Sequence, residues 1–135
     1  MKILIIDGQG GRLGKLLIEK IKSDKPSLEL IAVGTNSIAT SVMIKAGADM
    51  GATGENPVVV NAKNADVIIG PVGIIVANAL MGEVTPKMAC AVGESEAFKL
   101  LIPVNKCNNY IVGTKNIGIS DLVNEAAGKL YDIIG

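Results

Sequence analysis

The feature that most constrains this chain is a cluster of glycines between a short apolar segment and an amphipathic one. Residues 2–7 (KILIID) predict a buried strand, and residues 12–23 (RLGKLLIEKIKS) carry apolar side chains at helical spacing. The glycines lie between and just inside these segments, at Gly8, Gly10, Gly11 and Gly14. A strand, a glycine-rich turn and a helix in this order are typical of the first unit of a parallel α/β fold.

This turn has the properties of a phosphate-binding segment. Gly8 permits a sharp turn out of the strand, and Gly14 lets the helix pack close to it. Gly10 and Gly11 let the backbone approach an anion, and amides at the helix start point at the ligand. Arg12 can add a charge-assisted contact or lie across an adenine ring. We therefore predict a ligand-binding segment formed by Gly8, Gln9, Gly10, Gly11, Arg12, Leu13 and Gly14. The alternative is that the glycines serve only a tight turn, because the spacing GxGGxxG departs from GxGxxG.

The second predicted strand, residues 28–34 (LELIAVG), ends without the acidic residue that holds the ribose in NAD-binding proteins. The residues found there are Gly34, Thr35, Asn36 and Ser37. Uncharged hydrogen-bonding groups suit a ribose phosphate or a different ligand, which disfavours unmodified NAD and leaves NADP or another nucleotide. No arginine follows this strand to hold the additional phosphate of NADP. An equally weighted alternative is that these residues only cap the next helix.

Other predicted strand ends bring further polar groups to the same edge of the sheet. Residues 66–71 (DVIIGP) predict a strand that ends in Gly70, Pro71, Val72 and Gly73, where a nicotinamide would lie in a dinucleotide enzyme. Residues 51–56 (GATGEN) and 105–109 (NKCNN) are two more candidates for this edge. Ordinary turns, and for 105–109 a polar hairpin loop, are the alternative interpretation.

The rest of the chain continues the alternation of strands and helices. Helices are predicted for residues 37–46, 72–81, 86–97 (after the N-cap Thr85) and 120–133 (with Ser120 as N-cap), and a third strand for residues 57–61. Residues 99–104 and 110–114 predict the last two strands, and the short connection between them favours an antiparallel hairpin. The predicted fold is one Rossmann-like α/β domain over residues 1–135: three layers and a mostly parallel sheet with an antiparallel edge hairpin.

Composition narrows the classes of partner. Hydrophobic residues make up 49% of the chain but aromatic residues only 2%, so the core must be aliphatic and base stacking is unsupported. The zero net charge disfavours nucleic acid. The first apolar run is too short for a signal peptide or membrane span, so we expect a cytoplasmic protein. Histidine is absent, which excludes histidine triads and histidine metal sites, and no metal is expected.

Two resemblances add to this interpretation. The opening IDGQGGRLGKLL is similar to the start of dihydrodipicolinate reductases, which carry a GxxGRMG turn for NAD(P)H; their catalytic histidines have no counterpart here. The segments AVGTNSIAT, KAGADMGATGENPV, DVIIGPVGI, GEVTPKMACAVGES and LIPVNKCNN resemble a small bacterial family of unknown function. That resemblance implies a Rossmann-like fold and brings no catalytic residues.

Three functions remain open at this stage. The first is a nucleotide-binding module that acts as a sensor, a regulatory subunit or a partner-dependent oxidoreductase fragment. The second is a small oxidoreductase-like enzyme that uses the strand-end loops, with Lys106, Cys107 or Glu55 as candidates. The third is an oligomeric scaffold without a ligand, because high hydrophobicity in a short chain favours a homo-oligomer.

Overall fold

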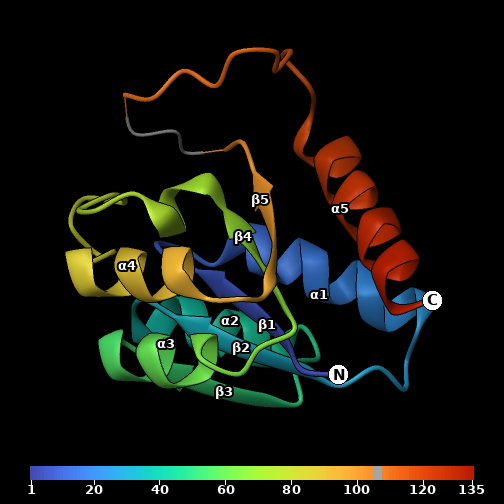
Figure 1. The fold of residues 1–135 in the computed structure, drawn as a ribbon. Helices are drawn as coiled ribbons and strands as arrows, with labels where there is room; N and C mark the ends of the chain where they lie inside the picture. The colour runs from blue at the N-terminus through green and yellow to red at the C-terminus, as the bar shows by residue number, and fades with distance from the viewer. Residues whose placement is uncertain (105–107) are drawn as a thin grey trace.

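A five-stranded parallel sheet forms the centre of the computed structural model, which describes residues 1–104 and 108–135. The strands are β1 (Ile3–Asp7), β2 (Leu30–Gly34), β3 (Met50–Thr53), β4 (Val67–Pro71) and β5 (Phe98–Ile102). They lie in the order β3-β2-β1-β4-β5, so β1 is central and pairs with both β2 and β4 (Figure 1). The order reverses between β1 and β4, and in open α/β sheets the carboxyl edge at such a point is the usual ligand site.

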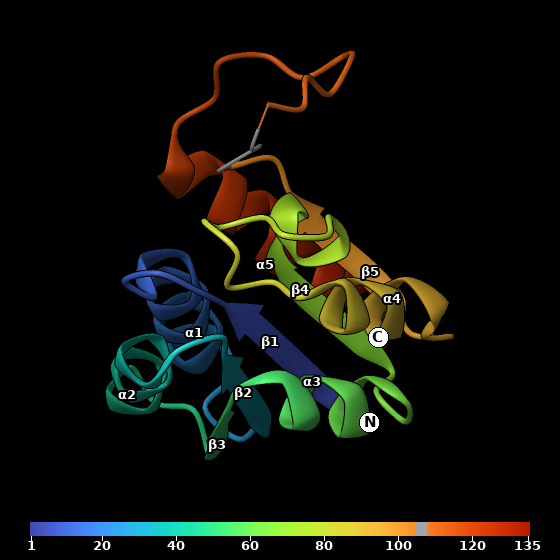
Figure 2. The ribbon, with the colours of Figure 1, turned by 90° about the vertical axis from the view of Figure 1, so that its left-hand side faces the viewer.

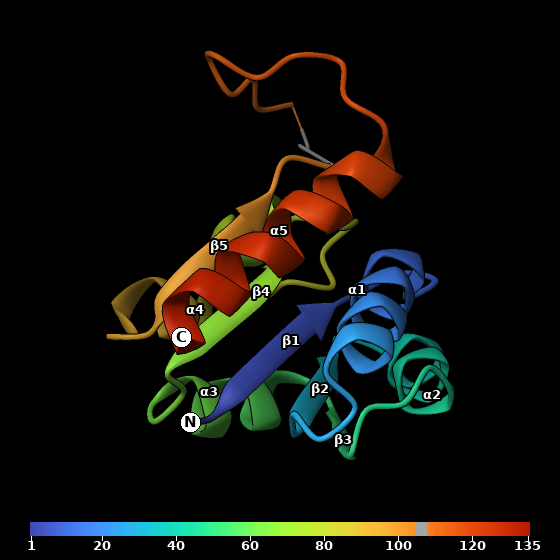
Figure 3. The same cartoon turned by 90° about the vertical axis from the view of Figure 1, so that its right-hand side faces the viewer.

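Helices cover both faces of the sheet. The helices α1 (Arg12–Asp24), α2 (Ser37–Lys45) and α5 (Ile119–Ile134) lie on one face (Figure 3). The helices α3 (Glu55–Ala62) and α4 (Pro86–Glu94) lie on the other with the 3-10 turn η1 (Val72–Ile75) (Figure 2). The predicted three-layer α/β architecture is therefore confirmed. No helix in the described part of the chain is long and apolar enough to cross a membrane.

The core is aliphatic and consists of two clusters, one on each face of the sheet, as expected for a parallel sheet that is covered on both faces. Ile3 and Ile5 of β1 point toward α1 and α5, whereas Leu4 and Ile6 point toward α3 and α4. These four side chains are at most 1% exposed. The strand that ends in the glycine turn is therefore held by apolar packing on both of its faces.

The third strand and the helix after it lie elsewhere than predicted. Residues 57–61 (PVVVN) form part of α3. The strand β3 is residues 50–53, which overlap the polar segment 51–56 (GATGEN) for which no strand was predicted. Pro57 fits the first helical turn, where its missing N–H is not needed. A short apolar run does not distinguish a strand from a helix by itself. The strand β3 is an edge strand with mostly exposed residues, so it lacks the apolar signal of a buried strand.

The predicted antiparallel hairpin is wrong. The strand β5 pairs with β4 in parallel, and residues 110–114 form no strand. The helix α4 is the crossover that makes this parallel pairing possible. Tyr110 and Val112 are 76% and 88% exposed, so their apolar character does not place them in the sheet. The connecting residues 105–107 lie outside the described residues.

Two helix predictions also need correction. The expected helix over residues 72–81 is reduced to η1, because the following segment takes left-handed backbone angles at Asn78, Leu80 and Met81. Ile74, Ala79 and Leu80 are buried without forming a helix face, whereas Ile75 and Met81 are exposed. The closing helix begins at Ile119 with Gly118 as its N-cap, so Ser120 does not cap it. The Thr85 cap of α4 is confirmed: its hydroxyl accepts from the amide of Met88.

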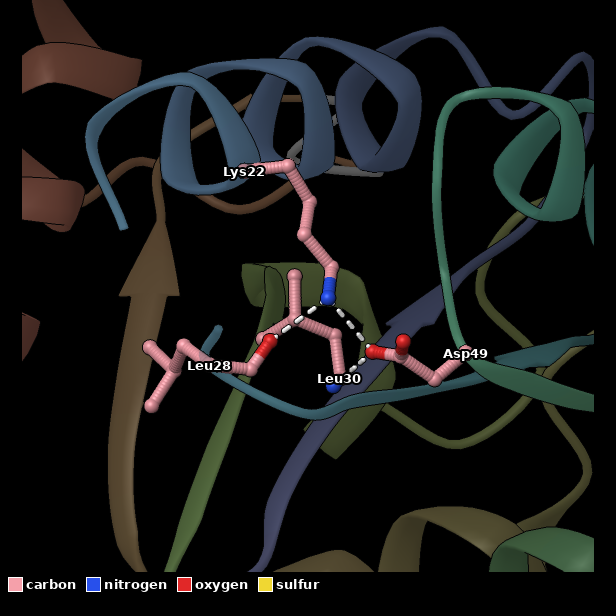
Figure 4. Close-up of polar contacts among 4 residues, drawn as sticks. All are labelled: Lys22, Leu28, Leu30 and Asp49. Atoms are coloured by element: carbon pink, nitrogen blue, oxygen red, sulfur yellow. Dashed lines mark hydrogen bonds and ion pairs between the residues drawn. The ribbon is translucent and has the colours of Figure 1, made fainter. Parts of the chain in front are cut away.

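A polar cluster fastens the amino-terminal ends of β2 and β3 to α1 (Figure 4). Nζ of Lys22 donates to the carbonyl of Leu28 at 2.7 Å and to Oδ2 of Asp49 at 2.6 Å. The same Oδ2 accepts from the amide of Leu30 at 2.8 Å. The hydrogen bond from Lys22, followed by that from Leu30, lowers the pKa of Asp49. This cluster lies at the edge of the sheet opposite the glycine turn.

The substitution Asp49→Asn tests this cluster through its pH dependence. A carboxyl whose pKa is lowered on folding stabilises the fold above its unfolded pKa, and this contribution disappears as the pH falls through the folded pKa. We expect the substitution to cost roughly 0.5 kcal/mol at neutral pH, because solvent screens a pair this exposed. The difference from the unsubstituted protein should begin to shrink as the pH falls through about 4, the pKa of an unfolded aspartate, and should disappear below the lowered pKa of folded Asp49. Urea unfolding at several pH values measures it. A pH-independent difference, or an equal effect of Glu125→Gln on α5, contradicts the assignment.

Candidate functional site

The glycine turn leaves the carboxyl end of β1 and enters α1 with a left-handed backbone at two residues. Gln9 has φ 48° and Gly11 has φ 71°. The amide of Gly11 donates to the carbonyl of Gly8 at 2.9 Å, and the carbonyl of Gly11 accepts the amide of Lys15 at 2.9 Å. Gly11 is the N-cap of α1 and offers no side chain as a cap. The strand–turn–helix context that the sequence predicted is therefore present.

Packing accounts for three of the four glycines in this turn. A Cβ at Gly8 would meet the side chains of Thr35, Leu80 and Glu83. A Cβ at Gly14 would meet Met43 of α2 and the Cβ of Asp7 at the end of β1, so this glycine lets α1 pack close to the strand as predicted. Gly11 combines a left-handed φ with a backbone contact to α2. Packing within the chain is therefore a sufficient reason for glycine at these three positions.

Gly10 differs from the others because nothing lies within 4 Å of the position where its Cβ would be. Gly10 borders an open hollow of about 290 Å³, lined by residues 7–13 together with Val104 and Ile119. Arg12 lies exposed beside it, and no hydrogen bond or ion pair among the described residues engages its guanidinium. The backbone of Gly10 and the guanidinium of Arg12 are thus both accessible on this side of the turn.

Asp7, the last residue of β1, binds the amides at the start of α1. Its Oδ2 accepts from the amide of Gly14 at 2.7 Å, and its Oδ1 accepts from the amide of Gly8 at 2.8 Å. Burial raises the pKa of Asp7, the two amide donors oppose this, and the nearby Glu83 raises it further. The amide of Thr35 donates to the carbonyl of Asp7 at 2.9 Å. Part of the helix terminus that the sequence assigned to a ligand therefore already holds a carboxylate of the chain.

A second carboxylate, that of Glu83, lies on the other side of the turn. Its Oε1 accepts from the amide of Gln9 at 2.9 Å, the hydroxyl of Thr35 at 2.7 Å and Nδ2 of Asn36 at 2.8 Å. Half-burial acts to raise the pKa of Glu83, but the three donors outweigh it and the pKa is lowered. Glu83 therefore stays ionised in this position and joins the loop after β4 to the ends of β1 and β2.

The segment that presents Glu83 is a compact loop with a strained backbone. Asn78, Leu80 and Met81 all have φ near 60°, and Gly82 follows with φ 89°. Left-handed angles at non-glycine residues are unfavourable and concentrate at functional sites. Ala79 and Leu80 are buried, whereas Met81 is 96% exposed. The loop thus covers Gly8 with Leu80 and directs Glu83 toward the end of β2.

The residues after β2 cap the next helix, as one of the two interpretations expected, and they also contact the glycine turn. Oδ1 of Asn36 accepts from the amide of Ala39 at 2.9 Å, so Asn36 is the N-cap of α2. Its Nδ2 also donates to the carbonyl of Gln9 at 2.9 Å, which brings this loop onto the glycine turn. Gly34 is required because a Cβ there would meet Thr40. Ser37 is exposed and lies in the first turn of α2.

Of the remaining predicted residues, some have a packing role and others lie near the carboxyl edge of the sheet. Gly70 approaches the carbonyl of Ile6 so closely that a Cβ would clash, and Pro71 and Gly73 are buried while Val72 is half-buried. Glu55 begins α3, and its Oε1 accepts from the hydroxyl of Thr85 at 2.7 Å. Lys106 and Cys107 lie outside the described residues. Within the described ranges, no three His, Cys, Asp or Glu residues are grouped as metal ligands.

Two carboxylates of this site were missing from the residues predicted from the sequence. Asp7 ends the first strand, and a buried acid directly before a glycine turn was a usable signal for a residue that binds the turn. Glu83 is 74 residues from Gln9 along the chain and follows Gly82 in a loop. Nothing local to residues 82–84 indicates that contact.

Comparison with known families gives one decisive match. The model described as "Domain of unknown function (DUF3842)" covers residues 2–134. The chain belongs to the DUF3842 family. This confirms the family of unknown function indicated by the sequence. No curated protein matches this DUF3842 chain significantly.

A solved structure is similar to this DUF3842 member at 14% identity. It is a dodecameric FMN-dependent UbiX-like decarboxylase from Escherichia coli O157:H7, and the alignment covers 98% of this chain and 94% of that chain with a TM-score of 0.43. A TM-score of this size supports no inference about the ligand or the activity of the DUF3842 chain.

The substitutions Gly8→Ala and Gly10→Ala should differ in how much stability they cost. A Cβ at Gly8 must displace the Thr35, Leu80 and Glu83 side chains, so we expect a loss of about 1–3 kcal/mol in the free energy of unfolding. A Cβ at Gly10 meets nothing, so the loss there should stay below about 0.5 kcal/mol. Urea unfolding of both variants measures the difference. Equal losses at the two positions would show that the contacts around Gly8 do not stabilise the turn.

Proposed function

We propose that the protein binds a phosphate-bearing small molecule, of nucleotide type, in the hollow beside the glycine turn. The observation that carries this proposal is Gly10: it has no packing reason to be glycine, and its backbone faces the hollow next to Arg12. Glycine without a steric requirement is expected where a ligand approaches the backbone. An exposed guanidinium adds a bidentate partner for phosphate.

The size of the hollow favours a ligand smaller than a dinucleotide. Its volume of about 290 Å³ lies at the lower end of small-molecule sites, which suits a phosphate with a sugar or a single base. Val104 and Ile119 supply an apolar wall opposite the turn. An NADP-like dinucleotide needs additional room over Gly8 toward the end of β2, where Leu80 and Glu83 now lie. A dinucleotide therefore binds only if this loop moves.

A role as sensor or regulatory module agrees best with the side chains around the hollow. The carboxylates of the edge, Asp7, Glu55 and Glu83, are all engaged in hydrogen bonds within the chain. An oxidoreductase-like enzyme remains the second proposal, since the hydride chemistry would then come from the cofactor and the protein would only position it.

The scaffold hypothesis has an observation of its own. Residues 108–118, which precede α5, lie outside the three layers (Figure 1), and they expose Val112 and Ile117. Exposed apolar side chains of this kind are typical of interfaces between proteins. A homo-oligomer is compatible with ligand binding, and light scattering of the Val112→Ser variant and of the unsubstituted chain tests whether this segment contributes to one.

The substitution Arg12→Ala tests the phosphate site. Loss of a charge-assisted hydrogen bond should weaken binding of AMP, FMN or NADP about tenfold or more while leaving the thermal unfolding temperature unchanged. Isothermal titration calorimetry measures the affinity. Lys15→Ala is the matched control, because Lys15 is an exposed cation on the next turn of α1 and does not line the hollow. Equal affinities of the two variants, or no binding by the unsubstituted protein, contradict the proposal.

A further inference from the structure

Three donors from two separate loops converge on one oxygen of Glu83. The amide of Gln9 comes from the glycine turn, and the Thr35 hydroxyl and Asn36 side-chain amide come from the loop after β2, all within 2.9 Å of Oε1. A convergent set of donors of this kind is what proteins use to hold an oxyanion. These three donors therefore form an oxyanion site, and the carboxylate of Glu83 occupies it.

The charge on Glu83 is balanced by hydrogen bonds alone. No ion pair among the described residues includes it, and the ion pairs present there are Lys20–Asp24 and Lys22–Asp49. The carboxylate of Asp7 lies close enough to add repulsion. Neutral donors hold any oxyanion of suitable shape, so nothing in this site selects the Glu83 carboxylate over another carboxylate or a phosphate.

The loop that carries Glu83 is suited to release it. Its backbone is strained at Asn78, Leu80 and Met81, and Met81 lies in solvent. Ala79, Leu80 and Val84 of this loop are buried and anchor it, so the loop can stay attached while the half-buried Glu83 side chain rotates outward. Exchange of the oxyanion therefore does not require the α/β core to open.

We propose that Gln9, Thr35 and Asn36 form an oxyanion subsite, which Glu83 fills as an internal competitor and which a carboxylate or phosphate group of the ligand takes over. The inference rests on the proposed function, because the glycine turn borders both this subsite and the hollow at Gly10. The ligand thus carries an anionic group that reaches across Gly8 toward the end of β2. The affinity of the protein for it is reduced by the competing side chain.

Anion rescue of the Glu83→Ala variant tests this inference directly. Without the carboxylate, the three donors lose their acceptor, and the variant should unfold at a lower temperature than the unsubstituted protein. Inorganic phosphate should then raise the unfolding temperature of Glu83→Ala more than that of the unsubstituted protein, because it stabilises only the protein that binds it. The amide signal of Gln9 in a ¹⁵N–¹H spectrum should shift with phosphate in the variant at lower concentration. Glu19→Ala on the exposed face of α1 is the matched control and should respond like the unsubstituted protein.

A second variant keeps the test decisive if Glu83→Ala folds poorly. Glu83→Gln preserves the shape and removes the charge, so it should bind NADP, which carries phosphate groups at two separate positions, about tenfold more tightly than the unsubstituted protein. Equal or weaker binding of NADP by Glu83→Gln, with binding still dependent on Arg12, overturns the inference and leaves the proposed function standing. No response of either Glu83 variant to phosphate or NADP overturns the inference, and the Arg12 comparison decides the proposed function separately.

Discussion

The hydrogen bonds of the Asp7 carboxylate determine the shape of the whole carboxyl edge. One oxygen accepts the amide at the start of the glycine turn and the other accepts an amide in the first turn of α1. The carbonyl of the same residue receives the amide of Thr35, so β1, α1 and the loop after β2 are fixed relative to one another. Because buried amides need acceptors, this arrangement removes the requirement for a bound anion at the helix terminus. Gly10 and Arg12 of the same turn, in contrast, stay exposed beside the hollow.

The first half of the fold follows closely from local patterns. The strand β1, the helix α1, the strand β2 and the Asn36 cap of α2 agree with apolar periodicity and capping chemistry, because each is specified by neighbours in the chain. The strand β3 could not be identified in this way, since an edge strand with exposed residues carries no buried pattern. Residues 57–61 were wrongly predicted as a strand for the opposite reason: their valines suit a strand or a buried helix face equally well.

The candidate site shows the same division between local and distant information. The turn itself and the role of Gly14 in packing could be predicted from the sequence, whereas the left-handed backbone of Gly11 was not predicted. The position of Glu83 depends on how the loop after β4 crosses the end of β1, which is a property of the tertiary fold. The sequence has no acidic residue directly after β2, which disfavours NAD. In the structure, however, the carboxylate of Glu83 lies there, supplied by the loop after β4. Functional assignments based on one motif therefore omit partners that only the folded sheet brings near.

The central place of β1 has a consequence for how the chain is made. This strand is synthesised first, but Ile3 finds its neighbour Val67 only after some sixty further residues have been added. Until then one edge of a strand that is apolar from Ile3 to Ile6 has no β4 to pair with, and such edges are prone to association with other chains. Long-range parallel pairing also slows folding. Synthesis on the ribosome should therefore leave the amino-terminal segment dependent on early pairing with β2, and variants that delay β4 should lose yield before they lose stability.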